Sequence, residues 1–131
     1  MAKRILIVDD SPTIRRMVAA SFLSTPGVET TEAASGLHAI EVLTTSPVHL
    51  MILDLNMPDM HGVEVLRFVR AHERYRALPI IVLTTRGDDD SRTAALKEGA
   101  TRYMTKPFVP AVLAAEAASL LETVAAERGR A

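Results

Sequence analysis

The chain has 131 residues, of which 48% are hydrophobic and 24% charged, and its formal net charge of −1 excludes a strong attraction to nucleic acid or membrane surfaces. It has no cysteine, which excludes disulfides and thiolate chemistry and fits a reducing compartment, and its apolar runs are far too short to span a bilayer. The N-terminus, MAKRILIVDD, closes with two acids and lacks the apolar stretch of a signal peptide, so we expect a cytoplasmic protein.

The first part of the chain predicts a buried strand followed by a helix. Ile5–Val8 is an apolar run without alternation, which is typical of a strand covered on both faces. Ser11 is a good N-cap, and Pro12 suits the first helical position. Apolar residues follow at helical spacing, and Phe22 closes their stripe before the Pro26–Gly27 pair ends the helix.

The rest of the chain alternates in the same way between short strand patterns and longer helical ones. Apolar runs bounded by turn or cap residues favour strands, and apolar residues every three or four positions favour helices. In chain order the predicted elements are strand Val28–Ala34, helix Gly36–Thr45, strand Leu50–Leu53, helix Val63–Ala71, strand Ile80–Leu83, helix Asp89–Glu98, strand Arg102–Thr105 and helix Pro110–Ala126.

Five strand–helix pairs in succession predict an α/β fold with a doubly wound, five-stranded parallel sheet and five helices. The second and fifth strands are weak and polar, which suits the two edges of the sheet, and the three apolar strands suit its middle. That arrangement matches the flavodoxin-like strand order 2-1-3-4-5. We expect one domain over residues 1–126 and a short C-terminal tail over residues 127–131.

Polar residues that can bind ligands or react follow the predicted strands, at the edge where parallel strands all end. Asp9 and Asp10 follow the first strand, Asp54 follows the third, Thr84 follows the fourth and Lys106 follows the fifth. Ligands of such folds bind outside the carboxyl ends of the strands, where the strand order reverses. The first and third strands flank that reversal, and together they carry all three acids.

Three carboxylates this close would either share protons or hold a hard cation such as Mg²⁺ or Mn²⁺. A lysine opposite them neutralises the acids when the site is empty and binds an anion when it is filled. A threonine hydroxyl adds a donor for a phosphoryl oxygen. These parts together can accept a phosphoryl group, and Asp54 is the natural nucleophile because it lies between the acid pair and the Thr84–Lys106 pair.

Four motifs in order resemble the signatures of receiver domains in bacterial response regulators: ILIVDDS, MILDLNMPDMHG, PIIVLTT and GATRYMTKPF. The resemblance covers roughly Arg4 to Ala125, and SPTIRRMV and DLNMP are most similar to the chemotaxis-type single-domain regulators. It implies a two-component phosphorylation switch that takes its phosphoryl group from a histidine kinase or phosphotransfer protein. Such a protein catalyses only its own phosphorylation and dephosphorylation.

The resemblance also implies a role for each residue that matches a motif position. The roles are phosphoacceptor for Asp54; metal ligands for Asp10, Asp54 and the backbone carbonyl of Asn56, with Asp9 acting through water; phosphoryl-oxygen ligands for Thr84 and Lys106; switch aromatic for Tyr103; a cis bond at Lys106–Pro107; and the turn after the site for Gly62. We further expect Asn56 and Arg86 to set the lifetime of the phosphoryl group, because they flank the approach of the hydrolytic water.

Two positions depart from the usual receiver pattern. Thr85 stands where a small residue is common, and its bulk narrows the space around the site threonine. Val109 stands where a helix cap is common, and valine cannot cap a helix.

Two other functions are compatible with the predicted fold. A phosphohydrolase acting through an aspartyl phosphate usually needs an acid two residues after the nucleophile, and that position holds Asn56. A flavin-binding domain would need a Ser/Thr/Gly-rich phosphate loop after the first strand, where the chain has Asp9 and Asp10. Both alternatives are therefore disfavoured against the phosphorylation switch.

Partner surfaces are predicted on two sides of the molecule. Arg15 and Arg16 form either a solvated helix face or a docking surface beside the site. Output partners are expected on the face of the fourth helix, fifth strand and fifth helix, near Lys97 and Tyr103. No output domain follows the last helix within these 131 residues, so we expect a stand-alone regulator or a receiver cut from a longer chain.

Overall fold

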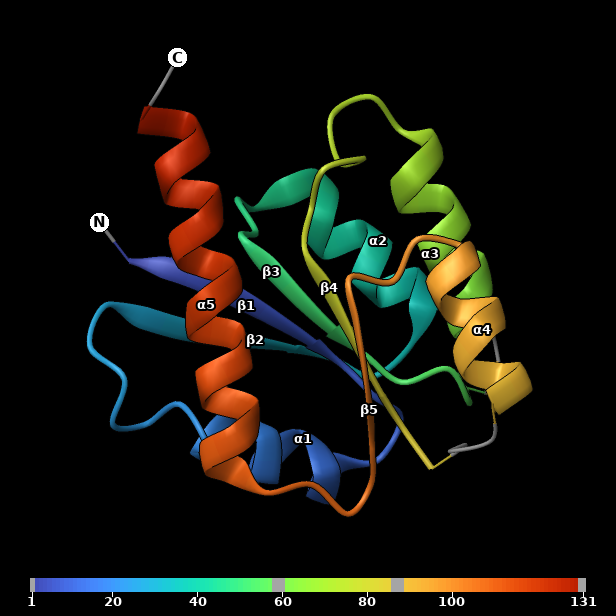
Figure 1. Cartoon of the computed structure of the whole chain (residues 1–131), viewed down its shortest axis with the longest axis horizontal. Coiled ribbons are helices and arrows are strands. Elements are labelled where there is room, and N and C mark those ends of the chain that lie inside the picture. Colours follow the sequence, from blue (N-terminus) through green and yellow to red (C-terminus); the bar gives the residue numbers. More distant parts are fainter. Residues whose placement is uncertain (1, 58–60, 86–88, 130–131) are drawn as a thin grey trace.

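The computed structural model describes residues 2–57, 61–85 and 89–129, with side chains as far as residue 122. Strands and helices alternate along this part of the chain (Figure 1). In order they are β1 (Lys3–Val8), α1 (Pro12–Ala20), β2 (Val28–Ala33), α2 (Gly36–Thr45), β3 (Leu50–Leu53), α3 (Gly62–Ala71), β4 (Ile80–Thr84), α4 (Asp89–Lys97), β5 (Arg102–Thr105) and α5 (Pro110–Gly129).

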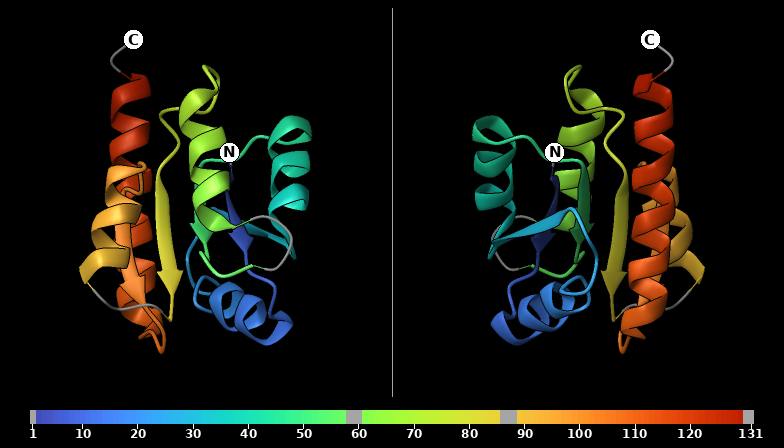
Figure 2. Two further views of the ribbon diagram at one scale, coloured as in Figure 1. Left: turned by 90° about the vertical axis from the view of Figure 1, so that its right-hand side faces the viewer. Right: turned by 90° about the vertical axis from the view of Figure 1, so that its left-hand side faces the viewer.

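The sheet is parallel throughout and has the order β2-β1-β3-β4-β5, which confirms the prediction. The three central strands carry the apolar runs and are almost wholly buried, while the polar strands β2 and β5 lie at the edges. Val8 pairs with Leu53, and Leu53 pairs with Val82, so these strands end level with one another. All strand arrows point toward the same end of the molecule, where α1 lies (Figure 2).

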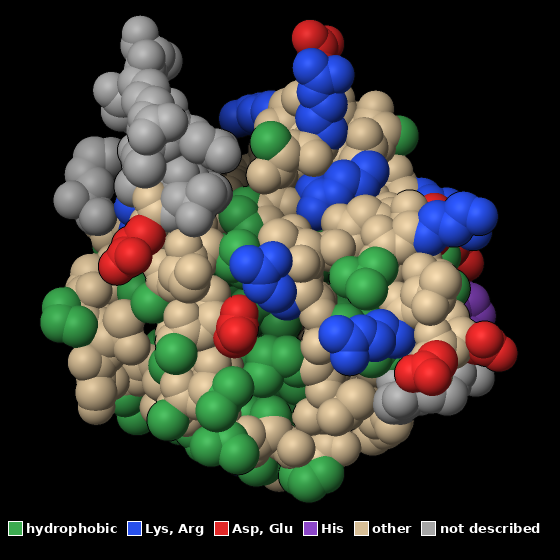
Figure 3. All heavy atoms as spheres, viewed as in Figure 1, with side chains coloured by type: hydrophobic (Ala, Val, Ile, Leu, Met, Phe, Trp, Pro, Cys, Tyr) green, Lys and Arg blue, Asp and Glu red, His purple; other side chains and the backbone are tan. Residues whose placement is uncertain are grey.

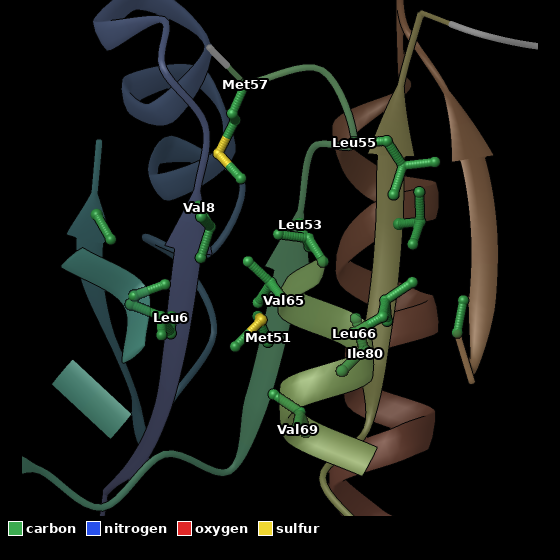
Figure 4. Close-up of a cluster of buried hydrophobic side chains, with 14 of the residues drawn as sticks. Leu6, Val8, Met51, Leu53, Leu55, Met57, Val65, Leu66, Val69 and Ile80 are labelled. Atoms are coloured by element: carbon green, nitrogen blue, oxygen red, sulfur yellow. The ribbon is translucent and has the colours of Figure 1, made fainter. Parts of the chain in front are cut away.

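Successive side chains of a strand point to opposite faces of the sheet, and the protein therefore has two cores. Leu6 and Val8 face the layer of α2, α3 and α4, where they pack with Met51, Leu53 and residues of α3 (Figure 4). Ile5 and Ile7 face the layer of α1 and α5, together with Val18, Phe22 and Leu113. Burial on both faces explains why the central strands are continuously apolar.

Two helix boundaries differ from the predicted ones by more than one residue. α1 ends at Ala20 rather than near Pro26, because the chain leaves the helix through turns in which the hydroxyl of Ser21 donates to the carbonyl of Met17. Phe22 is nevertheless buried against the same core. α5 continues to Gly129, past the expected boundary at residue 126. In the described part of the chain, no helix combines the length and apolar character needed to cross a membrane.

Gly62 is required by a close approach between α3 and the end of β3. It is the first residue of α3, and its N–H donates to the carbonyl of Leu55 over 3.1 Å. A Cβ added here would lie 2.6 Å from the carbonyl oxygen of Asp54 and 2.6 Å from the Cα of Leu55. Any larger residue would therefore push α3 away from the backbone that carries Asp54.

We expect Gly62→Ala to lower the free energy of unfolding by about 3 kcal/mol, the upper end of the usual cost of overpacking, because the contacted atoms are backbone and cannot rotate away. Gly27→Ala is the comparison. Gly27 has a φ of +73° but open space around the added Cβ, so alanine there costs only about 1 kcal/mol of left-handed strain. Urea denaturation measures both losses, and an equal or smaller loss for Gly62→Ala would contradict the packing argument.

Candidate functional site

The ends of β1 and β3 bring three carboxylates together. Asp9 and Asp10 follow β1, and Asp54 follows its neighbour β3. Each of the three acids offers an oxygen within 4.8 Å of the others. Asp9 and Asp54 are buried, at 3% and 5% exposed, whereas Asp10 is exposed at the rim. The predicted acidic cluster is thus present, and Asp10 is its solvent-facing member.

Lys106 closes the cluster from the end of β5. Its Nζ donates to Oδ2 of Asp9 over 2.7 Å and lies 3.4 Å from Oδ2 of Asp54. Its backbone N–H donates to the carbonyl of Thr84 over 2.8 Å, which fixes the end of β5 against β4. The Lys106–Pro107 peptide bond is cis, as expected. One ammonium group therefore bridges two buried carboxylates contributed by different strands.

The protein holds both oxygens of Asp9. Oδ2 accepts from Lys106, and Oδ1 accepts from the backbone N–H of Ser11 over 2.9 Å. Ser11 is the N-cap of α1, as predicted, and its hydroxyl accepts from the N–H of Ile14. Because Asp9 is occupied in this way, Asp10 is the freer of the two acids for binding a cation directly.

Asp54 is fixed by its own loop as well as by β1. Its backbone N–H donates to the carbonyl of Val8 over 2.9 Å, and Oδ1 accepts from the N–H of Asn56 over 3.2 Å. Leu55 and Met57 are buried in the core that α2, α3 and α4 cover, and they anchor the loop (Figure 4). Asn56 between them is exposed. Alternate burial along this loop keeps Asn56 beside the acid.

The pKa of Asp54 is raised above its ordinary value, mainly because burial disfavours the charged carboxylate. The negative charge of Asp9 raises it further. The N–H of Asn56, the positive charge of Lys106 and the hydroxyl of Thr84 act in the opposite direction and favour the ionised form. The surroundings of Asp54 therefore disfavour its charged form, and three neighbouring groups offset only part of that cost.

The hydroxyl of Thr84 lies close enough to Asp54 to favour its charged form, but it does not reach a hydrogen bond of good geometry. Thr84 is fully buried at the end of β4, and its Oγ1 has no hydrogen-bond partner of good geometry within the described ranges. An unsatisfied buried hydroxyl costs free energy and is uncommon unless a ligand completes it. The adjacent Thr85 is exposed.

The chemistry of this donor set fits a hard divalent cation. Oxygen ligands are what Mg²⁺ and Mn²⁺ prefer, and Mg²⁺ is commonly held by one or two carboxylates with several waters. Asp10 and Asp54 offer two such carboxylates, and Asp9 lies close enough to act through water. The soft ligands that would favour other metals are missing from this cluster.

Comparison with known proteins identifies the family. The family described as "Response regulator receiver domain" matches residues 5–118. The chain belongs to the response regulator receiver domain family. Receiver domains are signalling modules rather than classical enzymes, which decides against the phosphohydrolase and the flavin-binding module that the fold alone would allow.

This receiver domain is similar to chemotaxis regulators over nearly its whole length. It is 38% identical over 125 residues to "Chemotaxis protein CheY homolog" of Campylobacter jejuni, covering 95% of this chain and 96% of that protein. The structure of the chemotaxis response regulator CheY4 of Vibrio cholerae matches with a TM-score of 0.83 and 33% identity, covering 92% and 99% of the two chains. A receiver domain of a histidine kinase from Syntrophus aciditrophicus matches with a TM-score of 0.86 and 33% identity, covering 94% and 92%.

Three further residues were given roles from the sequence, and the structure describes two of them, Tyr103 and Arg15. Tyr103 is half-buried on β5, where it pairs with Val82 and packs in part against the core that α2, α3 and α4 cover. Arg86 lies outside the described residues. Arg15 was expected on a solvated or docking surface, but its side chain is only 15% exposed and bonds to Asp9 and Glu32. No sequence signal marks this contact, because it depends on β2 lying beside β1.

The raised pKa of Asp54 predicts a pH-dependent effect of Asp54→Asn. An acid whose pKa is higher in the folded protein contributes most stability below its ordinary value of 3.8, and loses that contribution as the pH rises through the folded-state pKa. The neutral asparagine avoids this loss. We expect Asp54→Asn to have a higher thermal midpoint than the wild type at pH 7 without divalent cations, with the difference closing toward pH 4.

Circular dichroism melts across this pH range measure the effect. Glu41→Gln, at an exposed carboxylate on α2, is the control and should not show the same pH-dependent gain. If the thermal midpoint of Asp54→Asn at pH 7 is equal to or lower than that of the wild type, the ionised Asp54 does not destabilise the folded protein as its raised pKa predicts.

Proposed function

We propose that Asp54 accepts a phosphoryl group from a histidine kinase or phosphotransfer protein in a reaction that requires Mg²⁺. The observation that carries this proposal is the placement of Asp54 between the acid pair, within 4.8 Å, and the ammonium of Lys106, 3.4 Å away. Its side chain is largely buried, and its surroundings include both cationic and anionic groups.

In the transfer step a carboxylate oxygen of Asp54 forms a bond to phosphorus, and the bond from phosphorus to the donor histidine nitrogen breaks. The bonding electrons return to the imidazole of the donor, and the chain becomes an acyl phosphate. Lys106 offers its ammonium to the phosphoryl oxygens, and the unpaired hydroxyl of Thr84 offers a hydrogen bond.

A bound Mg²⁺ would neutralise charge on the acids and on the incoming phosphoryl oxygens. Asp10, Asp54 and the backbone carbonyl of Asn56 are proposed as its ligands, with Asp9 acting through water. The contacts of Asp9 with Lys106 and Ser11 support that division, because both of its oxygens already accept hydrogen bonds.

The phosphodonor is proposed to dock beside α1. Arg16 and Met17 are exposed on this helix, with Met17 49% exposed, and α1 begins directly after the acid pair. The surface is partly cationic and partly apolar and lies next to the atom that reacts. Arg15 is not part of it, since its side chain is turned toward Asp9 and Glu32.

Output is proposed through the face formed by α4, β5 and α5. Phosphorylation would draw the hydroxyl of Thr84 toward Asp54, and Tyr103 on the neighbouring strand would turn inward to fill the vacated space. Tyr103 lines a hollow of about 330 Å³ whose other walls include Phe108, Val112 and Arg92. Figure 3 shows hydrophobic side chains gathered beside Lys and Arg on this face, and partners are expected there, near Lys97.

The lifetime of the phosphoryl group is proposed to depend on Asn56 and Arg86. Asn56 is exposed and lines a cleft of about 640 Å³ between α3 and α4, by which water can reach the site. We also propose a cytoplasmic location, where the kinases that supply such donors act. The receiver domain is proposed to span residues 1–126 with a tail over 127–131, although α5 itself continues to Gly129.

Labelling with radioactive acetyl phosphate and Mg²⁺ tests the acceptor. We expect base-labile, acid-stable label on the wild type and none on Asp54→Asn, because the asparagine side chain has no carboxylate to attack phosphorus. Asp90→Asn, at an exposed acid of α4, is the matched control and should label fully. Full labelling of Asp54→Asn would show that another residue is the acceptor.

Mg²⁺ should raise the thermal midpoint by binding to the folded state and relieving repulsion among the acids. Lys106→Ala should bind Mg²⁺ at least as tightly as the wild type, because it removes a positive charge that competes with the cation, although it should label poorly. A midpoint that does not change across millimolar Mg²⁺, or a Lys106→Ala variant that no longer binds Mg²⁺, would count against the proposed metal site.

A further inference from the structure

Arg15 ties three elements together behind the acid pair. It lies in the first part of α1, and its Nη1 donates to the backbone carbonyl of Asp9 over 2.7 Å. Its Nε donates to Oε1 of Glu32 over 3.0 Å, and Glu32 lies on β2, where it pairs with Ile7 of β1. The guanidinium thus links the helix, the junction after β1 and the edge strand.

The carbonyl that Arg15 holds belongs to the peptide unit that joins Asp9 to Asp10. A peptide unit is planar, so fixing its oxygen fixes the whole plane and with it the direction in which Asp10 leaves the strand. Asp9 has further anchors through Ser11, Lys106 and its own N–H, which donates to the carbonyl of Ala33. Asp10 is exposed, so the direction of its side chain depends more on the orientation of this peptide plane than on packing.

We propose that Arg15 is a positioning residue of the phosphorylation site, which sets the peptide plane before Asp10 and thereby the affinity of the site for Mg²⁺. This inference rests on the proposed function. Mg²⁺ requires near-octahedral ligands at closely defined distances, so a small shift of one carboxylate weakens its binding. Arginine is suited to the task because its rigid fork reaches two acceptors at once, which the single nitrogen of lysine cannot do in the same geometry.

The positive charge of Arg15 makes the opposite prediction. By charge alone, a cation near the acids repels Mg²⁺, so removing it would strengthen metal binding and replacing it by lysine would change nothing. The two explanations are therefore separated by Arg15→Lys, which keeps the charge and loses the fork.

Isothermal titration of the full chain with MgCl₂ measures the difference. We expect Arg15→Lys to bind Mg²⁺ about tenfold more weakly than the wild type, the lower end of the effect of residues that orient a metal ligand. Arg16→Lys is the matched control on the exposed side of the same helix and should bind like the wild type. The amide resonance of Asp10 should move in Arg15→Lys even without Mg²⁺, because the peptide plane has changed.

Glu32 gives a second test that does not alter Arg15. Glu32→Ala and Glu32→Gln remove the same negative charge, but only glutamine keeps an oxygen that accepts from Nε of Arg15. We expect Glu32→Gln to keep most of the affinity for Mg²⁺ and Glu32→Ala to lose it. This pair also decides the question if Arg15→Lys does not fold.

The outcomes separate this inference from the proposed function. If the wild type binds no Mg²⁺, the proposed metal site itself is wrong. If the wild type binds Mg²⁺ and Arg15→Lys binds it equally well, or if the two Glu32 variants lose affinity equally, the positioning role of Arg15 is wrong while the proposed function stands.

Discussion

The ammonium of Lys106, shared between the carboxylates of Asp9 and Asp54 at 2.7 Å and 3.4 Å, is the interaction on which the site depends. Two buried carboxylates side by side repel each other and lose their hydration, and only a buried cation of opposite charge makes that placement tolerable. The three residues come from the ends of β1, β3 and β5, and Lys106 is 97 positions from Asp9. The parallel sheet brings the three residues to one edge, so the arrangement of the strands creates the site.

Not every buried polar group at this site is fully balanced by a charge or a hydrogen bond. The two that are not, Asp54 and Thr84, are groups to which we propose a role in phosphorylation. Asp54 has a raised pKa in spite of Lys106, and the buried hydroxyl of Thr84 has no partner of good geometry in the part of the chain that the structure describes. Natural sequences accept such local costs mainly at functional positions. In the proposed function, a phosphoryl group with its metal ion would offset the charge on Asp54 and accept a hydrogen bond from Thr84, which would give the site two states of different shape and charge.

The fold could be predicted from the sequence because each element carries its own local signal. Apolar runs mark the central strands, Ser11 marks the start of α1, and the polar composition of β2 and β5 marks them as edges. The end of α1 could not be predicted, because the turn at Ser21 and the buried Phe22 depend on the core under α5. The motif suggested a turn for Gly62, and the structure adds a reason that the motif could not give, a close approach to the backbone of Asp54.

The meeting of Asp9, Asp10, Asp54, Thr84 and Lys106 at one edge of the sheet could be predicted, since each lies at or just after the end of a strand. The contacts that distinguish one from another could not. That Asp9 is occupied by Lys106 and Ser11, and that Arg15 holds the next peptide unit, are facts of the assembled structure. A crystal structure with Mg²⁺ and beryllofluoride, a phosphoryl analogue, tests this account most directly. It should show the analogue on Asp54, Mg²⁺ on Asp10 and Asp54, and Lys106 and Thr84 turned to the analogue. Lys106 still bonded to Asp9 as it is now, with the analogue or the metal bound elsewhere, would contradict the account.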